Sequence, residues 1–419
     1  MERKTIKTFI GLGIIASIIA IVFPLATFFA NKVPSPIYIE NEDDFSKINN
    51  NLSGYYILKG AVKFTKPVKP IGDKDHPFTG RFDCASSISG FSLNNVVIDL
   101  NNLDLEKYTI ENKIYIGLFA FNEGTIIHSV FNDIKFQNFD YDGNNDLYIG
   151  GLTGLNKGKI TSNKIYQISN ISFSSQKNIV FGGCAGLNVG EIRRNSYTKH
   201  FECYVSCNTF SIGEFAGECN ENSVIEMCAA GSNIQIYNSD SLHANQINVG
   251  VACGIFGGGL IQNNMFNNSN INLMNNNICT TNCGGIVGLV SGSNKALIKD
   301  CYFNAVINSN GLNLQNNSFV CGNVLSENLI LENLLIGGAL SSHNISSGIV
   351  NFFDATVKST ESIKNCYLLD NARVPDSCLK NIKNTINIRD VTLRTMNWSD
   401  AIWNISEGKI SFKALYNEE

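Results

Sequence analysis

Residues 150–160 read GGLTGLNKGKI and residues 182–192 read GGCAGLNVGEI, so a glycine-rich phrase occurs twice with every Gly and its Asn in the same place. Degenerate variants of the phrase begin at Ile116 (IGLFAFNEGTI), Gly213 (GEFAGECNENSVI), Cys253 (CGIFGGGLI) and Gly284 (GGIVGLVSGSNKALI). Taking Gly117, Gly151, Gly183, Glu214, Gly254 and Gly285 as equivalent gives gaps of 34, 32, 31, 40 and 31 residues. A period of this size indicates a stacked repeat.

The sequence between two copies of the phrase consists of short runs of alternating apolar and polar residues, such as 159–168, 171–175 and 179–186. Such alternation is typical of strands, and Asn, Gly and Lys separate the runs. Three short strands and three turns per period describe one coil of a parallel β-helix. We therefore predict an all-β, right-handed parallel β-helix. A propeller, with longer blades, and a sandwich, with closer strands, both fit this period less well.

The phrase itself has a predicted structural role. Its glycines should permit turns with positive φ and close approach to the neighbouring coil, and its Asn should tolerate left-handed geometry. The apolar residue inside the phrase should point into the solenoid. The predicted inward stack consists of Leu152, Cys184, Phe215, Ile255 and Ile286.

The N-terminus has a different composition from the rest. Residues 9–30 carry no charge and follow a basic segment, 1–8. They are long enough for a transmembrane anchor and longer than the apolar region of a typical cleaved signal peptide. The basic flank predicts a cytoplasmic N-terminus and an extracellular body in a single-pass membrane protein. Cleavage of 9–30 as a signal peptide, which would make the body secreted, stays open. Residues 31–38 read as a linker.

Charge and cysteine content exclude two common classes of function. The formal net charge is −4 and no basic stripe is present, which argues against nucleic-acid partners. The 13 Cys form no C-x-x-C pair, and the closest His–Cys grouping is His200, Cys203 and Cys207, a weak zinc candidate. A shared repeat position for Cys228, Cys301, Cys366 and Ser129 indicates small packing residues instead.

No catalytic, cofactor-binding or metal-binding residue is predicted. The segment 140–146 (DYDGNND) resembles the start of a calcium loop, but its Gly is misplaced and no Glu follows at the required distance. An Asx- and Gly-rich turn is the preferred interpretation. Acidic residues that could serve a polysaccharide-active enzyme, Asp133, Asp240, Asp300 and Asp354, lie at different phases of the repeat, so no opposed carboxylate pair is expected.

The two clear phrases, with the flanking stretches 39–60, 70–84 (ending PFTGRFDC) and 396–415, resemble the GLUG repeat of bacterial surface and secreted proteins, which are often adhesin-like. The resemblance implies a β-helical chain displayed at the cell surface and brings no catalytic residue. It divides the chain into an N-terminal capping region (39–110), GLUG-like repeats (111–370) and a closing segment (371–419).

The predicted function is adhesion or binding by a membrane-anchored, surface-exposed β-solenoid, with a host surface, a glycan or a partner protein as ligand. Stacked coils suit this role because they present long faces with repeated side chains. An extracellular polysaccharide-active enzyme on the same scaffold and a purely structural envelope protein are the alternatives, because a fold does not determine a function.

Protease treatment of intact cells that express the full chain should degrade the body beyond residue 38, because the basic flank of residues 9–30 retains the N-terminus inside. Immunoblots against tags at each end provide the measurement, with lysed cells as the control. Protection of the body together with cleavage of an N-terminal tag would reverse the assigned orientation.

Overall fold

The structure is a computed structural model. It describes residues 35–84, 91–100, 103–169, 171–199, 201–238, 243–275, 279–310, 316–342, 363–373, 385–406 and 408–413. Within these ranges no helix combines the length and apolarity that a membrane crossing requires. The predicted anchor, 9–30, lies outside the described residues, as do segment 1–8 and His200.

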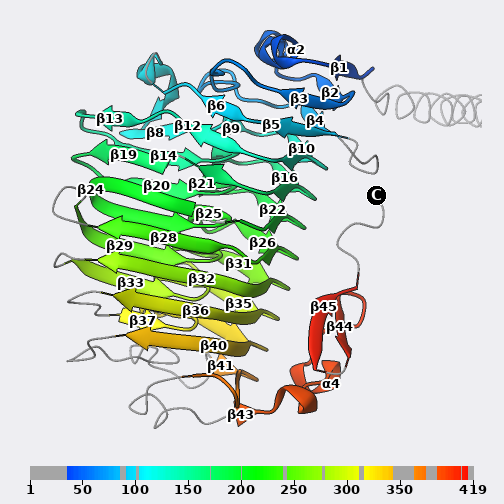
Figure 1. The fold of residues 1–419 in the computed structure, drawn as a ribbon, viewed down its shortest axis with the longest axis vertical. Helices are drawn as coiled ribbons and strands as arrows, with labels where there is room; N and C mark the ends of the chain where they lie inside the picture. Colours follow the sequence, from blue (N-terminus) through cyan, green and yellow to red (C-terminus); the bar gives the residue numbers. More distant parts are fainter. Residues whose placement is uncertain are drawn as a thin grey trace, which may run out of the picture. The chain divides into compact units, whose positions relative to one another are not determined.

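The body, Tyr38 onward, is a parallel β-solenoid of about eight coils. In one coil, β20 (Ile179–Gly182), β21 (Ala185–Asn188), β22 (Glu191–Arg193), β23 (Ser196–Tyr197) and β24 (Phe201–Gly213) follow one another around the core. Each pairs in parallel with its equivalents in the coils before and after, as β20 does with β14 and β24. Figure 1 shows the resulting layers of arrows. The solenoid prediction is confirmed, and its right-handed winding stays a prediction.

Among the described residues, equivalent strands align into long sheets. An eleven-stranded sheet contains β1 (Ile37–Ile39), β2 (Tyr55–Leu58), β4 (Arg81–Asp83), β10 (Thr125–Ile127), β16 (Lys159–Thr161), β22, β26 (Val224–Glu226), β31 (Gly259–Gln262), β35 (Ala296–Lys299), β39 (Leu329–Glu332) and β41 (Ile363–Lys364). A seven-stranded sheet contains β9 (Phe119–Asn122), β15 (Thr153–Asn156), β21, β25 (Ala216–Cys219), β30 (Cys253–Phe256), β34 (Val287–Val290) and β38 (Cys321–Val324). A three-stranded sheet contains β6 (Val96–Ile98), β12 (Ile134–Phe136) and β18 (Ile168–Ser169).

The largest sheet has 22 strands in the described part of the chain. Besides β20, β23 and β24 it contains β3 (Ala61–Lys63), β5 (Ser92–Asn94), β7 (Thr109–Ile110), β8 (Lys113–Ile116), β11 (Val130–Phe131), β13 (Phe139–Tyr141), β14 (Asp146–Gly150), β17 (Lys164–Ile165), β19 (Ile171–Ser175), β27 (Ala229–Ala230), β28 (Asn233–Asn238), β29 (Ala244–Gly250), β32 (Met265–Asn275), β33 (Thr280–Gly284), β36 (Tyr302–Asn310), β37 (Asn316–Ser318), β40 (Leu335–Ser342), β42 (Tyr367–Leu369) and β43 (Thr385–Ile386).

The pairing corrects one predicted equivalence. Phe119, Thr153, Ala185, Ala216, Cys253, Val287 and Cys321 occupy one register, so the coils measure 34, 32, 31, 37, 34 and 34 residues. Glu214 N donates to Val251 O at 2.9 Å, so Val251, and not Gly254, is the equivalent of Glu214. Leu152, Cys184, Phe215 and Ile286 are buried as predicted. The predicted Ile255 is wrong, because Ala252 takes the inward place and Ile255 is half-buried.

Close approach of backbones, and not positive φ, explains the glycines of the phrase. A Cβ added at Gly186 would lie 2.7 Å from the backbone N of Ile149, which no real side chain tolerates. None of the glycines of the two clear copies, from Gly150 to Gly190, has positive φ, so that part of the prediction is wrong for them. In the later variants Gly258, Gly259 and Gly292 do have positive φ. The phrase Asn is in a strand: Asn122 Nδ2 donates to Asn156 Oδ1 at 2.7 Å, and Asn156 Nδ2 to Asn188 Oδ1 at 2.8 Å.

Left-handed backbone occurs at a different row, one residue per coil: His128, Ser162, Arg194, Met227, Asn263, Asp300, Asn333 and Asn365. The next residue points inward. Ser129, Cys228, Cys301 and Cys366 occupy this position, as predicted, and each hydroxyl or thiol donates to the carbonyl two residues earlier, at 2.9, 3.4, 3.1 and 3.3 Å. Burial raises the pKa of Cys228 and of Cys301 to about 12, so these thiols stay protonated and act as packing groups.

Both ends of the described solenoid carry extra elements. Near the N-terminus, α2 (Glu42–Ser46), η1 (Lys47–Asn50) and η2 (Leu105–Tyr108) accompany the first coils, and Phe45 packs edge-on against Phe64 and Phe82. Near the C-terminus lie η4 (Ile388–Asp390), α4 (Leu393–Met396), β44 (Trp403–Ser406) and β45 (Lys409–Phe412). The stacked rings of Trp398 and Trp403 join this segment to the row of left-handed residues, because Trp398 Nε1 donates to Asn333 O at 2.9 Å and Trp403 Nε1 to Asn263 Oδ1 at 3.4 Å.

One carboxyl group lies inside the apolar core. Glu214 is fully buried, and both of its carboxyl oxygens, the hydroxyl of Tyr197 and the hydroxyl of Ser232 lack a well-formed hydrogen bond. Burial raises the pKa of Glu214 to about 8, and the nearby Ser232 hydroxyl only partly opposes this rise. The group is therefore a neutral acid in the folded protein at neutral pH.

Substitution of Glu214 by Gln should remove a pH dependence of stability. Below pH 4.5 the carboxyl is protonated in both states, whereas between pH 4.5 and about 8 only the unfolded chain ionises, so the wild type loses about 1.4 kcal/mol per pH unit as pH rises. The loss ends above the folded pKa. Thermal unfolding midpoints of both proteins from pH 4 to 9 measure the difference.

The E214Q midpoint should move above that of the wild type progressively from pH 5 to 8. Glu214→Val, which copies Val251 of the next coil, is the matched apolar control. Parallel pH profiles for all three proteins would contradict a buried, neutral carboxyl at this position.

Candidate functional site

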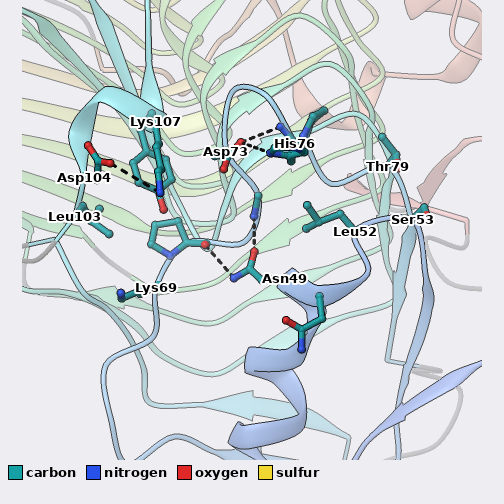
Figure 2. Close-up of a pocket in the computed structure, with 15 residues that line it drawn as sticks. Asn49, Leu52, Ser53, Lys69, Asp73, His76, Thr79, Leu103, Asp104 and Lys107 are labelled. Atoms are coloured by element: carbon teal, nitrogen blue, oxygen red, sulfur yellow. Dashed lines mark hydrogen bonds and ion pairs between the residues drawn. The ribbon is translucent and has the colours of Figure 1, made fainter.

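One hollow lined by described residues lies near the N-terminal elements (Figure 2). It measures about 680 Å³ and is lined by both charged and apolar side chains, among them Asn49, Asp73, His76, Asp104 and Lys107. Mixed lining of this kind is compatible with a ligand site, so the state of its polar groups decides its role.

The polar groups of this hollow are largely engaged within the chain. Asn49 accepts from Gly72 N at 2.8 Å and donates to Pro70 O at 3.4 Å. Asp73 Oδ1 accepts from His76 N at 2.8 Å and lies 3.2 Å from His76 Nδ1. Lys107 Nζ lies 3.8 Å from a carboxyl oxygen of Asp104. These polar groups are paired with other groups of the same loops. The hollow is therefore better interpreted as a structural cleft than as a binding site.

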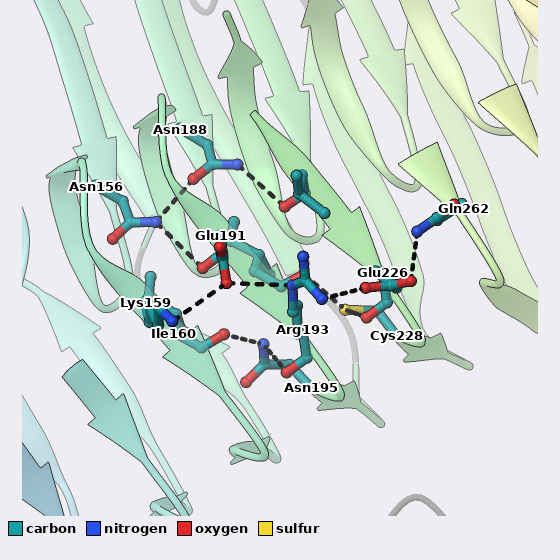
Figure 3. A network of polar contacts seen from close by, with 12 residues as sticks. Asn156, Lys159, Ile160, Asn188, Glu191, Arg193, Asn195, Glu226, Cys228 and Gln262 are labelled. Atoms are coloured by element: carbon teal, nitrogen blue, oxygen red, sulfur yellow. Dashed lines mark hydrogen bonds and ion pairs between the residues drawn. The ribbon is translucent and has the colours of Figure 1, made fainter. Parts of the chain in front are cut away.

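A second polar cluster lies on the eleven-stranded sheet (Figure 3). Arg193 bridges Glu191 and Glu226, with N–O distances of 3.2 and 2.6 Å, and the amide of Gln262 donates to Glu226. Each group contacts its equivalent in a neighbouring coil. Lys159 Nζ lies 3.9 Å from Glu191, so the cluster links coils by alternating charge and its two cations balance its two carboxylates.

The outward face of the long strands β24, β28, β32 and β36 is different in character; we call it the long-strand face. One row on it, the tyrosine row, consists of Ser172, Tyr204, Tyr237 and Met274 in direct register. The rings of Tyr204 and Tyr237 stack at 4.5 Å with an angle of 4° between their planes. Tyr204 is 36% exposed and Met274 40% exposed, so the row presents a ridge of aromatic and thioether groups to solvent.

A second row runs beside the tyrosine row, two residues away on each strand. This amide row consists of Glu202, Gln235, Asn272 and Asn308. Asn308 Nδ2 donates to Asn272 Oδ1 at 2.8 Å, so part of the row is a coil-to-coil ladder. Together the two rows place aromatic rings next to hydrogen-bonding amides on one flat surface, the usual composition of a site for polar ligands.

The ridge ends at a small hollow of about 160 Å³. It is lined by Asn138, Gln167, Ile168, Ser169, Ser172, Glu202 and Tyr204. The hollow forms because Ser172 is small at the row position where the next coil carries Tyr204. The ring of Tyr204 therefore projects beyond the side chain of Ser172. We take the long-strand face with this hollow as the candidate site.

The structure separates the residues that the sequence singled out. In the segment 140–146, Tyr141 receives hydrogen bonds from Asn145 N and Nδ2 at 3.3 and 2.9 Å, and Asp146 accepts from Asn178 N at 3.1 Å. That arrangement is a closed turn. Asp133 accepts a hydrogen bond from Ser169 Oγ at 2.9 Å. Asp300, which accepts from Asn333 at 2.7 Å, lies several coils away from Asp133. Asp240 and Asp354 lie outside the described residues.

No metal-ligating group of three or more His, Cys, Asp or Glu side chains is found in the described ranges. Cys203 and Cys207, the partners proposed for His200, are buried in β24. Sequence reasoning missed the tyrosine row. Its signal was available, because Tyr204 and Tyr237 each sit at an outward position of an alternating run, FECYVSC and IQIYN, one coil length apart.

Comparison with known proteins gives limited information. No family model matches the sequence, and no curated protein matches it. An IgA1 protease structure aligns at 15% identity over 80% of this chain with a TM-score of 0.44, and this chain spans only 22% of that protein. A Bacteroides ovatus protein, named provisionally as an immunoglobulin A1 protease, aligns at 12% identity over 90% of this chain and 92% of its own, with a TM-score of 0.40.

The GLUG resemblance has no support from a family model and rests on the sequence motifs alone.

Proposed function

We propose that this chain is a surface-displayed binding protein that holds a neutral glycan against the long-strand face. The tyrosine row carries the proposal. The C–H groups on one side of a sugar ring form an apolar patch that packs on an aromatic face, and Tyr combines such a face with a polar tip at low entropic cost.

The chemistry of the amide row supports a glycan over an apolar partner. Amides donate and accept hydrogen bonds at the same time, as sugar hydroxyls do, so Gln235 can pair with either end of a hydroxyl group. Asn272 accepts from Asn308 and donates to Asn233, which leaves it one amide hydrogen and one lone pair for a ligand. A protein partner would need a larger apolar core than one row of rings provides, because stable interfaces bury about 1,600 Å².

Charge also favours a neutral ligand. The chain is acidic overall, with a formal net charge of −4, and Glu202 stands at one end of the amide row. The net negative charge of the chain disfavours an anionic polymer. Anchorage by residues 9–30 and an outward body, as the sequence predicts, would bring the face into contact with extracellular glycans.

The alternative of a polysaccharide-active enzyme needs two carboxyl groups about 5 to 10 Å apart at the bound sugar. Glu202 is the single acidic residue among those that line the hollow. This observation favours binding without hydrolysis.

The test is retention of the full chain, solubilised in mild detergent, on immobilised neutral polysaccharides, among them mannan, galactan and chitin. We expect Tyr204→Ala combined with Tyr237→Ala to reduce retention on the preferred polymer at least 10-fold, because the double variant removes the exposed edges of both rings and the side of Tyr204 that faces Ser172. A 10-fold loss corresponds to about 1.4 kcal/mol.

Tyr38→Ala, which removes an exposed tyrosine outside the long-strand face, is the matched control and should leave retention unchanged. Equal retention of the double variant and the wild type would disprove the proposed face. Release of reducing ends from the same polymers by the wild type would instead support the enzymatic alternative.

A further inference from the structure

Glu214 takes part in an exchange of side-chain size across the core. Two coils further on, the equivalent residue is Gly285, and a Cβ added there would collide with the ring of Phe303. In the coil of Glu214, the residue equivalent to Phe303 is Ala230. A carboxyl side chain therefore extends toward the space that an aromatic ring occupies elsewhere in the array.

Three hydroxyl groups belong to the same part of the core. Tyr197 comes from the preceding coil, Ser232 from the coil of Glu214 and Ser269 from the next coil. The two serines precede residues that pair in register, so they occupy adjacent levels of one row. Glu214 and Ser269 are 0% exposed, Tyr197 is 1% and Ser232 is 3% exposed, which places all four side chains out of reach of bulk solvent.

Two of the hydroxyls lie beside the carboxyl. Burial is the main cause of the raised pKa of Tyr197, and the carboxyl of Glu214 adds to it. Burial likewise raises the pKa of Glu214, and the hydroxyl of Ser232 opposes that rise. Effects of this kind act over short distances, so Tyr197, Glu214 and Ser232 form one polar cluster that spans two coils.

The protein itself supplies few hydrogen bonds to this cluster. Both carboxyl oxygens of Glu214 and the hydroxyl oxygens of Tyr197, Ser232 and Ser269 have no well-formed hydrogen bond to another described residue. Burial of an unpaired polar group is costly, and native cores rarely contain several such groups together. The cluster therefore indicates a hydrogen-bonding partner from outside the chain.

The chemistry of the four groups favours water over a cation as that partner. A carboxylic acid and a hydroxyl each donate and accept hydrogen bonds, as water does, and a buried water typically makes about three hydrogen bonds. A cation would need an ionised carboxylate, whereas burial raises the pKa of Glu214 to about 8. The acid form of Glu214 is the form that pairs with water in both directions.

We propose that Glu214, Tyr197, Ser232 and Ser269 line an internal binding site for ordered water, in which a water molecule bridges the Glu214 carboxyl to the hydroxyls of Tyr197 and Ser232. Ser269 extends the site by one coil. The bound water supplies part of the hydrogen bonding that the protein does not, and so permits a carboxyl group at a glycine position of the repeat. The site is separate from the long-strand face, because all four side chains are buried.

The direct test is a crystal structure of the full chain in mild detergent, at a resolution that places ordered water. We expect electron density for water within hydrogen-bonding distance of the Glu214 carboxyl and of at least one of the Tyr197 and Ser232 hydroxyls. Absence of density beside the carboxyl would overturn the site. Density with the coordination of a cation, together with an unfolding midpoint that depends on whether Na⁺ or K⁺ is present at constant ionic strength, would overturn water as its occupant.

A pair of substitutions tests the bridge in solution. At pH 6, Tyr197→Phe should lower the thermal unfolding midpoint of the wild type by about 1 to 2 °C, because the water loses a partner. In a Glu214→Val background, where the site is apolar on one side and too poor in partners to hold water, the same substitution should leave the midpoint unchanged or raise it.

Tyr56→Phe is the matched control, because the Tyr56 hydroxyl donates directly to the backbone carbonyl of Asn51. It should lower the midpoint equally in both backgrounds, since distant sites contribute independently. Equal shifts for Tyr197→Phe in the two backgrounds would show that the hydroxyl and the carboxyl share no partner, and would overturn the proposed bridge. If Glu214→Val does not fold, Ser232→Ala combined with Tyr197→Phe gives the second test: the crystal structure of that variant should lack the bridging water, and its persistence would contradict the assigned ligands.

Discussion

The structure depends on one constraint, which is that each strand forms its hydrogen bonds with its equivalent in the next coil. In this arrangement equivalent residues stack about 4.8 Å apart along the solenoid. A side chain must therefore fit the same row above and below it, as the Asn122–Asn156–Asn188 ladder does. The same rule explains why one inward row contains both Ser129 and the cysteines Cys228 and Cys301. Each of these side chains donates to the carbonyl two residues earlier.

The same constraint creates the candidate site. When one row carries Tyr in two consecutive coils, parallel stacking of the rings follows from the backbone register, without a dedicated binding loop. A change of residue along the row then produces a step, as between Ser172 and Tyr204. A hollow in a solenoid can thus form where the repetition of a row begins or ends, whereas rows whose neighbouring side chains pair, as Arg193 and Glu226 do, connect coils.

The sequence was sufficient to predict the solenoid, the inward position of Leu152 and the shared row of Cys228 and Cys301, since all three depend on periodicity. It failed at the coil that follows Glu214. Two extra residues lie in the turn between Cys219 and Val224, and four between Tyr237 and Ala244, relative to the preceding coil. An insertion in a turn leaves the pairing of the strands intact but lengthens the spacing between equivalent residues. For this reason Gly254 was wrongly taken as the equivalent of Glu214. The tyrosine row was missed although Tyr204 and Tyr237 stand at outward positions one coil apart, because the stacking of their rings depends on the register between coils.

Glu214 gives the array a point of weakness in its middle. In a linear repeat protein each coil is stabilised only by its own contacts and by its two interfaces, so stability behaves as a one-dimensional sum. A coil that carries an unsatisfied acid contributes less to that sum than its neighbours do. The solenoid is then better regarded as two cooperative blocks joined at this coil, whose coupling weakens as the solution becomes more alkaline.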